Sequence, residues 1–186
     1  MRKTEDFNAA DRIAAKLLEN STHFLVGDIC EDNVSEAIRW IVYENLDSKA
    51  AKTLTLYINS QGGDLYQGFA LIDTIRNSHH PVRTIGIGQV MSAAFLIFAS
   101  GEKGERYIAK NTGIMCHQYS DSPEGKYHDI KAQMKEGEYC NARMLSVLKE
   151  ATGLSATRVK SKLLPASDVY LTAQELVDLG VADHII

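Results

Sequence analysis

Three residues from distant segments have the chemical types that nucleophilic catalysis requires: Ser92, His117 and Asp168. A serine hydroxyl attacks a carbonyl efficiently only when a base such as imidazole removes its proton, and a carboxylate can hold that imidazole in the required orientation. Serine, histidine and aspartate follow one another here in a chain order that such a triad can take. The pattern predicts acyl transfer, and we interpret the chain as a serine peptidase.

Ser92 lies in a segment, residues 88–101, whose other side chains are mostly small or apolar. A hydroxyl in such surroundings needs a hydrogen-bond partner, and without one it costs on the order of 1 kcal/mol or more. An apolar strand pattern precedes it at 82–87, and an apolar helical pattern follows at 93–99. Backbone amides at a helix start stabilise developing negative charge, so this junction suits a nucleophile.

The other parts of an acyl-transfer site have candidates near predicted strand ends and turns. His117 ends the predicted strand 113–117, and parallel sheets gather functional groups at the carboxyl ends of their strands. We therefore expect His117 and Ser92 to share one edge of the sheet. The Gly62–Gly63 turn and Ala93 are expected to supply the two backbone amides of an oxyanion hole, each worth about 3 kcal/mol to the transition state.

Strand and helix patterns alternate along most of the chain. Predicted strands cover 22–26, 53–59, 81–87, 105–109, 113–117 and 181–186; predicted helices cover 6–20, 31–46, 65–76, 93–99, 129–151, 155–164 and a last one from the capping box at 172–175 to Gly180. This alternation predicts an α/β fold of right-handed βαβ units with a mainly parallel sheet. We expect one domain over 1–186, with an N-terminal segment and helix at 1–20 and a projecting region at 118–151.

Composition narrows the class of protein. The 186 residues are 45% hydrophobic and 24% charged with a net charge of −4, which predicts a folded globular chain. No basic stripe with interleaved aromatic residues is present, so we expect no nucleic-acid partner, and no apolar run reaches the ~18 residues of a membrane span. Three scattered cysteines and an N-terminus without an apolar core predict free thiols and a cytoplasmic location.

Other interpretations exist for individual residues. Cys116 is an alternative nucleophile beside His117, but adjacent strand residues point to opposite faces, so we expect it in the core. Alone, Ser92 would be a small helix-start residue, His117 a structural histidine, and Asp168 a turn or cap residue. His79 and His80 precede Pro81 in a predicted solvated loop, and we expect no metal site. The combination of residues favours catalysis.

Short motifs follow one another in a fixed order between residue 16 and the C-terminus. They are YINSQGG (57–63), IDTI (72–75), GQVMSA (88–93), ASGEKGER (99–106), residues 111–118, LTAQEL (171–176) and LGVAD (179–183). In sequence and order these motifs closely resemble the proteolytic subunits of Clp proteases. One departure is Gln61, which stands where that family usually has proline and leaves the expected donor at Gly63 in place.

The resemblance implies a fold and a set of functional residues. The fold would be a crotonase-like spiral of βαβ units with a projecting handle of one long helix and a strand. Ser92, His117 and Asp168 would be the catalytic residues, and Gly63 and Ala93 the oxyanion donors. An extended substrate would lie between the glycine turn and the handle strand 122–127. The implied substrate-binding residues are Gly62, Gly63, Met91, Ser122 and Gly125.

The resemblance also implies an assembly. Two stacked seven-membered rings, a tetradecamer, would enclose a chamber in which unfolded polypeptides are degraded. The sequence has no GxxxxGK[ST] phosphate loop, so ATP-driven unfolding would come from a separate Clp-type ATPase. No cofactor is expected. Two alternatives use the same fold: a catalytically idle ring subunit, and an acyl-CoA enzyme that uses the two amides but no serine nucleophile. The intact Ser92 and His117 favour the peptidase.

Overall fold

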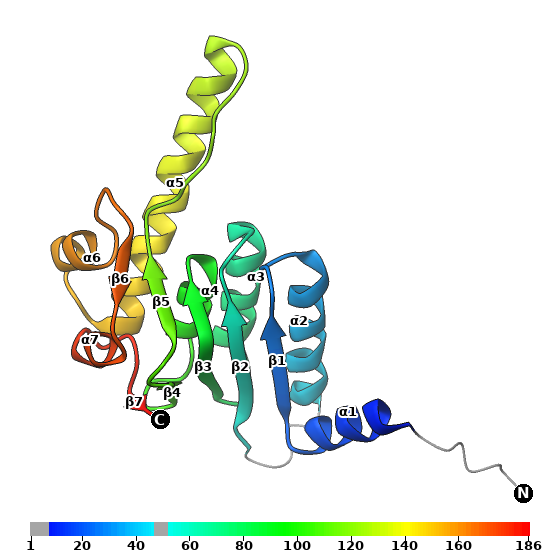
Figure 1. Cartoon of the computed structure of the whole chain (residues 1–186). Coiled ribbons are helices and arrows are strands. Elements are labelled where there is room, and N and C mark those ends of the chain that lie inside the picture. Colours follow the sequence, from blue (N-terminus) through cyan, green and yellow to red (C-terminus); the bar gives the residue numbers. More distant parts are fainter. Residues whose placement is uncertain (1–7, 47–51) are drawn as a thin grey trace, which may run out of the picture.

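A seven-stranded sheet forms the centre of the computed structural model, which describes residues 8–46 and 52–186 (Figure 1). The strands are β1 (Thr22–Val26), β2 (Leu54–Ser60), β3 (Val82–Met91), β4 (Arg106–Ile108), β5 (Gly113–Cys116), β6 (Val169–Leu171) and β7 (His184–Ile185). The helices are α1 (Ala9–Glu19), α2 (Glu31–Leu46), α3 (Leu65–Arg76), α4 (Ala93–Ala99), α5 (Tyr127–Thr152), α6 (Ala156–Lys162) and α7 (Ala173–Asp178).

Most of the sheet is parallel, as the alternation of patterns predicts. Strands β1, β2, β3, β4 and β7 pair in parallel in that order, while β5 pairs in parallel with β3 and antiparallel with β6. On β2 every second residue from Leu54 to Ser60 is buried, and this face joins the hydrophobic core. The chain is therefore a mixed α/β protein.

Strand β3 is longer than predicted, and its length places the nucleophile candidate. The sequence pattern ends at residue 87, but β3 continues to Met91. Gly88 has φ +62, which glycine adopts without strain, and the bent strand changes its neighbour from β4 at residues 84–86 to β5 at residues 89–91. Because β3 ends at Met91, Ser92 lies at the carboxyl end of a central strand.

Helix α4 begins directly after Ser92 and has the predicted bounds. All seven of its residues are buried, so it packs on every side against the rest of the core. A helix without any exposed face is rigidly placed, since protein interiors are close-packed. The backbone that directly follows Ser92 is therefore held in one position by the core.

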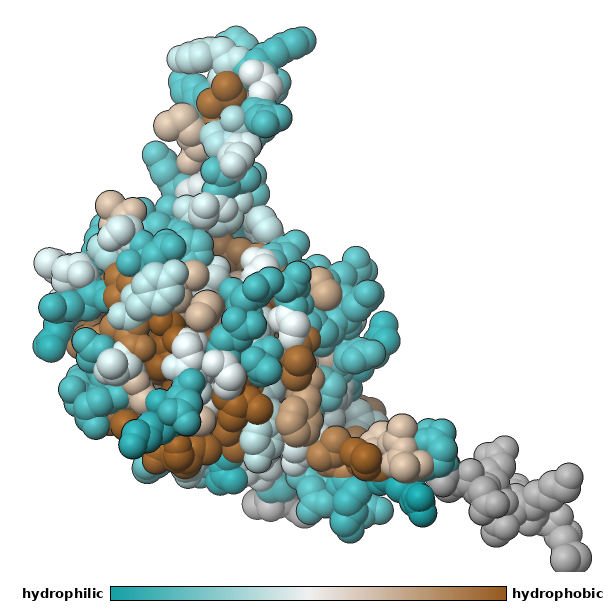
Figure 2. Space-filling view, in the orientation of Figure 1, coloured by the Kyte–Doolittle hydropathy of each residue, from teal (hydrophilic) through white to brown (hydrophobic). Residues whose placement is uncertain are grey.

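Helix α5 has two halves with different surroundings. Its buried residues, Cys140, Met144, Val147 and Leu148, all lie in the second half, whereas the first half extends beyond the body of the protein (Figure 1). Tyr127, Met134 and Tyr139 are exposed on that projection, and Figure 2 shows that its surface is otherwise largely hydrophilic. Across residues 8–46 and 52–186, no helix combines the length and apolar character that a membrane crossing requires.

The strand predicted for the handle at 122–127 is not formed. Residues 118–126 have no strand ladder, and α5 already begins at Tyr127. Side chains of α5 hold this segment instead: Gln133 bonds the backbone of Glu124 in both directions, at 3.0 and 3.1 Å, and Asn141 accepts from the amide of Tyr119 at 2.9 Å. A strand needs a second strand as partner, and within the described part of the chain none lies beside this segment.

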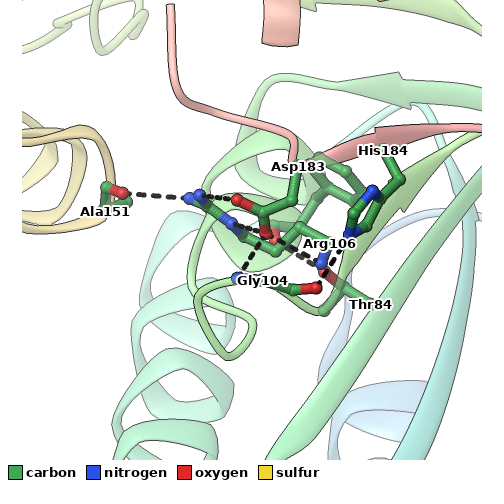
Figure 3. A network of polar contacts seen from close by, with 7 residues as sticks. Thr84, Gly104, Arg106, Ala151, Asp183 and His184 are labelled. Atoms are coloured by element: carbon green, nitrogen blue, oxygen red, sulfur yellow. Dashed lines mark hydrogen bonds and ion pairs between the residues drawn. The ribbon is translucent and has the colours of Figure 1, made fainter.

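An ion pair fixes the C-terminal end of the chain to the sheet. The buried Arg106 guanidinium donates to both carboxylate oxygens of Asp183, at 2.7 and 2.8 Å, and to the carbonyl of Ala151 at 3.0 Å (Figure 3). The amides of Gly104 and Arg106 also donate to Asp183 Oδ2. The network connects β4, the end of α5 and the segment that leads into β7.

Candidate active site

Ser92 has an unusual backbone conformation at the junction of β3 and α4. Its φ is +53° and its ψ is −123°, a region that costs a non-glycine residue about 1–3 kcal/mol. The Ser92 amide donates to the carbonyl of Met115 at 3.0 Å, which ties the junction to β5. The surrounding core holds this strained turn in place, and strain of this kind is concentrated at functional sites.

His117 contacts Ser92 directly. The distance from His117 Nε2 to Ser92 Oγ is 2.7 Å, within the range for proton transfer between a hydroxyl and a base. His117 follows β5, whose Met115 pairs with Met91 at the end of β3, so both side chains leave the same edge of the sheet. The structure thus brings together the two residues that were expected to share this edge.

The serine and histidine open into a cavity of about 300 Å³. Its lining residues are Gly63, Asp64, Leu65, Tyr66, Ser92, Ala93, His117, Gln118, Tyr119, Ser120 and Met144. Tyr66, Tyr119 and Met144 were not predicted as site residues. Their positions in the sequence could have indicated two of them, because Tyr66 closely follows the glycine turn and Tyr119 closely follows His117. Nothing in the sequence indicates Met144 on α5.

Two residues at this site have backbone amides without a hydrogen-bond acceptor among the described residues. The amide of Gly62 donates to Ser60 Oγ at 3.1 Å, but among the described residues nothing accepts from the amides of Gly63 or Ala93. Both residues line the cavity, and Ala93 is the first residue of α4. Such free donors beside a nucleophile are suited to bind the oxygen that becomes negative in acyl transfer.

The glycine turn, which we define as Gln61–Gly63, lies against Ser92. Gly62 has φ +103, and a Cβ placed there would lie 2.6 Å from Ser92 Cβ and 2.9 Å from the carbonyl oxygen of Met91. Neither the conformation nor the space suits any residue larger than glycine. The same Cβ would lie 3.2 Å from the amide nitrogen of Ala93, which lines the cavity together with Gly63.

Gly62→Ala is expected to lower kcat for a fluorogenic peptide about 100-fold or more, because the added methyl group pushes the turn, and with it the amide of Gly63, away from Ser92. Gly153→Ala is the matched control, since Gly153 also has positive φ, +72, but no atom within 4 Å of an added Cβ. The control should keep the wild-type kcat. Equal kcat values in both variants would contradict this role of the turn.

Asp168 and His117 lie next to the paired strands β6 and β5, but within the described residues no hydrogen bond joins them. Asp168 directly precedes β6, in which Val169 pairs with Cys116, so continuing the register by one residue sets Asp168 opposite His117. The side chain is exposed, and no hydrogen bond joins these two within the described residues. Strand β6 was not predicted because it has only three residues, although Val-Tyr-Leu is a typical strand composition.

Three predicted substrate-binding residues do not line the cavity. Ser122 and Gly125 are exposed in the segment before α5, further along it than the lining residues Tyr119 and Ser120. The Met91 side chain instead lies over Gly113, where its Cε would be 3.2 Å from an added Cβ. Met91 and Ser92 are adjacent at a strand end and point to different sides, which explains the difference.

The structure argues against Cys116 as the nucleophile. Its side chain is in the core at 1% exposure, and burial raises the pKa of the thiol to about 12, although a backbone hydrogen bond from His117 acts in the opposite direction. The reactive thiolate is therefore scarce at neutral pH. Within residues 8–46 and 52–186, no group of three His, Cys, Asp or Glu side chains is arranged to hold a metal ion.

Fold and site together define an α/β protein with a serine–histidine pair beside two free backbone amides. Comparison with known families matches residues 4–186 to the family described as Clp protease. Among curated proteins, the chain is 31% identical over 181 residues to "ATP-dependent Clp protease proteolytic subunit 1" of Leifsonia xyli subsp. xyli (strain CTCB07), covering 97% of this chain and 90% of that protein.

The chain belongs to the Clp protease family. Membership implies a protease of the serine type, in agreement with the sequence-based prediction.

Proposed function

We propose that this protein is a serine endopeptidase subunit in which Ser92 is the nucleophile and His117 the general base. The observation that carries the proposal is the 2.7 Å contact between Ser92 Oγ and His117 Nε2, beside the free amides of Gly63 and Ala93. An idle subunit would not need this contact, and an acyl-CoA enzyme that uses only the two amides would not need the serine. The peptidase is therefore the function favoured here.

The reaction follows from the positions of these groups. As Ser92 Oγ attacks the peptide carbonyl carbon, His117 Nε2 takes the hydroxyl proton, and the carbonyl oxygen becomes an anion that the Gly63 and Ala93 amides bind. His117 then gives the proton to the leaving amine, and the C–N bond breaks. Water attacks the resulting acyl ester by the same route in reverse, which releases the acid and restores Ser92.

Asp168 is proposed to orient His117 in the working enzyme. Val169 pairs with Cys116, so Asp168 and His117 are the next residues of the two paired segments, and we propose that a change of side-chain torsion angles brings the carboxylate to His117 Nδ1. The carboxylate would hold the imidazole tautomer and stabilise the imidazolium. We infer that substrate or assembly selects this rotamer.

Substrate and assembly are inferred from exposed surfaces together with the family. A polypeptide must be extended to reach Ser92 in a cavity of about 300 Å³, which supports unfolded chains as substrates.

The projecting half of α5 and the exposed residues Phe24 and Val26 on β1 leave apolar surface for neighbouring subunits. We propose that the fold is the crotonase-like spiral and that the subunits form two stacked heptameric rings. We also propose a separate ATPase as partner, as the words "ATP-dependent" in the relative's name suggest. Three free thiols support a cytoplasmic location.

The test compares a disordered polypeptide with a folded protein of similar length as substrates, with fragments identified by mass spectrometry. The assembled wild-type protein should cut the disordered chain at many sites and leave the folded one intact, unless a Clp-type ATPase and ATP are added. Cys116→Ala should retain cleavage, since its thiol is not the nucleophile. Absence of cleavage of the disordered chain, both alone and with the ATPase, would overturn the proposal.

A further inference from the structure

The glycine turn (Gln61–Gly63) is connected to a second loop by a side-chain hydrogen bond outside the cavity. Gln61 Nε2 donates to Asp28 Oδ1 at 2.6 Å, across 33 residues of sequence. We propose that Gln61 is a positioning residue for the oxyanion hole, which acts through Asp28 to hold the amide of Gly63 in place. The inference rests on the proposed peptidase function and adds a residue to its machinery.

The turn is placed where a small displacement affects the reaction. A Cβ at Gly62 would meet Ser92 Cβ at 2.6 Å, and a Cβ at Gly63 would meet the carbonyl oxygen of Ile29 at 2.4 Å. The turn therefore lies between the nucleophile on one side and the loop after β1 on the other. Any movement of that loop changes the distance from the Gly63 amide to an oxygen bound beside Ser92.

Backbone bonds join the turn to the same loop on both sides of Gly63. The amide of Ile29 donates to the carbonyl of Gly62 at 2.8 Å, and the amide of Asp64 donates to the carbonyl of Ile29 at 2.8 Å. The Gly63 N–H is left out of this pairing, and Gly63 lines the cavity. The Gln61–Asp28 bond extends the pairing by one residue and fixes the end of the turn that precedes Gly62.

The acceptor, Asp28, belongs to a loop that is itself anchored. Asn33 on α2 donates to the carbonyl of Asp28 at 2.7 Å and to that of Val26 at 3.2 Å, and its own oxygen accepts from the amide of Cys30 at 3.2 Å. Three bonds from one side chain hold the loop to the start of α2. Gln61 is therefore tied to a fixed support, and the carboxylate charge strengthens the bond.

The test exchanges donor and acceptor across this pair. Gln61→Glu sets two carboxylates against each other, and we expect kcat for a fluorogenic peptide to fall about 5–10-fold while KM changes less than about twofold. In the double variant Gln61→Glu/Asp28→Asn the amide at position 28 donates to the carboxylate at position 61. This double variant should recover kcat to within about twofold of the wild type.

Gln174→Glu is the matched control, because Gln174 donates to Asp178 Oδ1 at 2.9 Å on the exposed surface of α7. It makes the same change of charge beside an aspartate and should leave kcat unchanged. The rate of Ser92 labelling by a fluorophosphonate should follow kcat in every variant, since the phosphonyl oxygen occupies the oxyanion hole. Melting curves and native mass verify folding and assembly.

Wild-type kcat in Gln61→Glu, or a double variant no faster than Gln61→Glu, would overturn the inference. If Gln61→Glu does not fold, Gln61→Ala takes its place: kcat should fall about threefold, and Asp28→Asn should not restore it. A labelled, active wild type with unaffected variants removes only this inference. A wild type that is neither labelled nor active removes the proposed function itself.

Discussion

Ser92→Ala is expected to lower kcat for peptide hydrolysis by at least ~10⁴-fold, the largest effect of any single substitution. The variant removes the hydroxyl that lies 2.7 Å from His117 Nε2 and, with it, the nucleophile proposed above, while Gly63 and Ala93 still line the cavity. Binding and the oxyanion donors remain, so KM should change little and a small residual rate should persist.

The measurement is steady-state hydrolysis of a fluorogenic peptide by the assembled protein. His117→Ala should lose nearly as much activity, and the double variant should lose no more than either single one, because the two side chains act as a unit. Ser161→Ala, an exposed serine on α6, is the control and should retain the wild-type rate. Losses that add in the double variant would contradict a shared proton-transfer role.

Asp183→Ala is expected to lower the free energy of unfolding by about 3–5 kcal/mol, the largest effect on stability. The carboxylate is the partner of a guanidinium whose side chain is only 2% exposed, at 2.7 Å (Figure 3). Removing it leaves the Arg106 charge buried without a counterion and also removes the acceptor for the amides of Gly104 and Arg106. Such an uncompensated buried charge is strongly unfavourable.

Urea unfolding followed by circular dichroism, at fixed protein concentration because assembly affects stability, measures the difference. Asp178→Ala on the exposed side of α7 should change stability by less than about 0.5 kcal/mol.

Burial raises the pKa of Asp183, but the hydrogen bonds and charge of Arg106 outweigh it and hold the pKa below its usual value.

The sign of the pH dependence follows from this lowered pKa. The ion pair stabilises the folded chain fully above the unfolded carboxyl pKa of about 3.9, and that stabilisation is lost as pH falls through the lower folded-state value. The stability gap between wild type and Asp183→Ala should therefore narrow below pH 4. A gap that is constant down to pH 2 would contradict the ionic origin.

Local sequence signals were sufficient for the elements that carry Ser92 and His117. Helix α4 has the predicted bounds and its continuous apolar run is entirely buried, and α2 and α3 were also correctly bounded. The predicted strand before Ser92 ended too early, at residue 87, because a glycine such as Gly88 is typical of a turn. Its positive φ instead bends β3, which then pairs with β5.

The features that depend on long-range contacts were not predictable in this way. Strand β6 exists because it pairs with β5, and nothing in its three residues indicates that partner. The bond from Gln61 to Asp28 spans 33 residues and has no local pattern. Conversely, the handle strand at 122–127 was predicted from the resemblance, and side chains of α5 hold that segment without a ladder.

The central claim is that Ser92 is the nucleophile activated by His117, and covalent labelling tests it most directly. The assembled wild-type protein is incubated with a fluorophosphonate, digested, and the adduct located by mass spectrometry. The account predicts one adduct per chain on Ser92 and a labelling rate at least ~10³-fold lower in His117→Ala. Peptide cleavage by a protein that carries no adduct on Ser92, or an adduct on another residue, would contradict it.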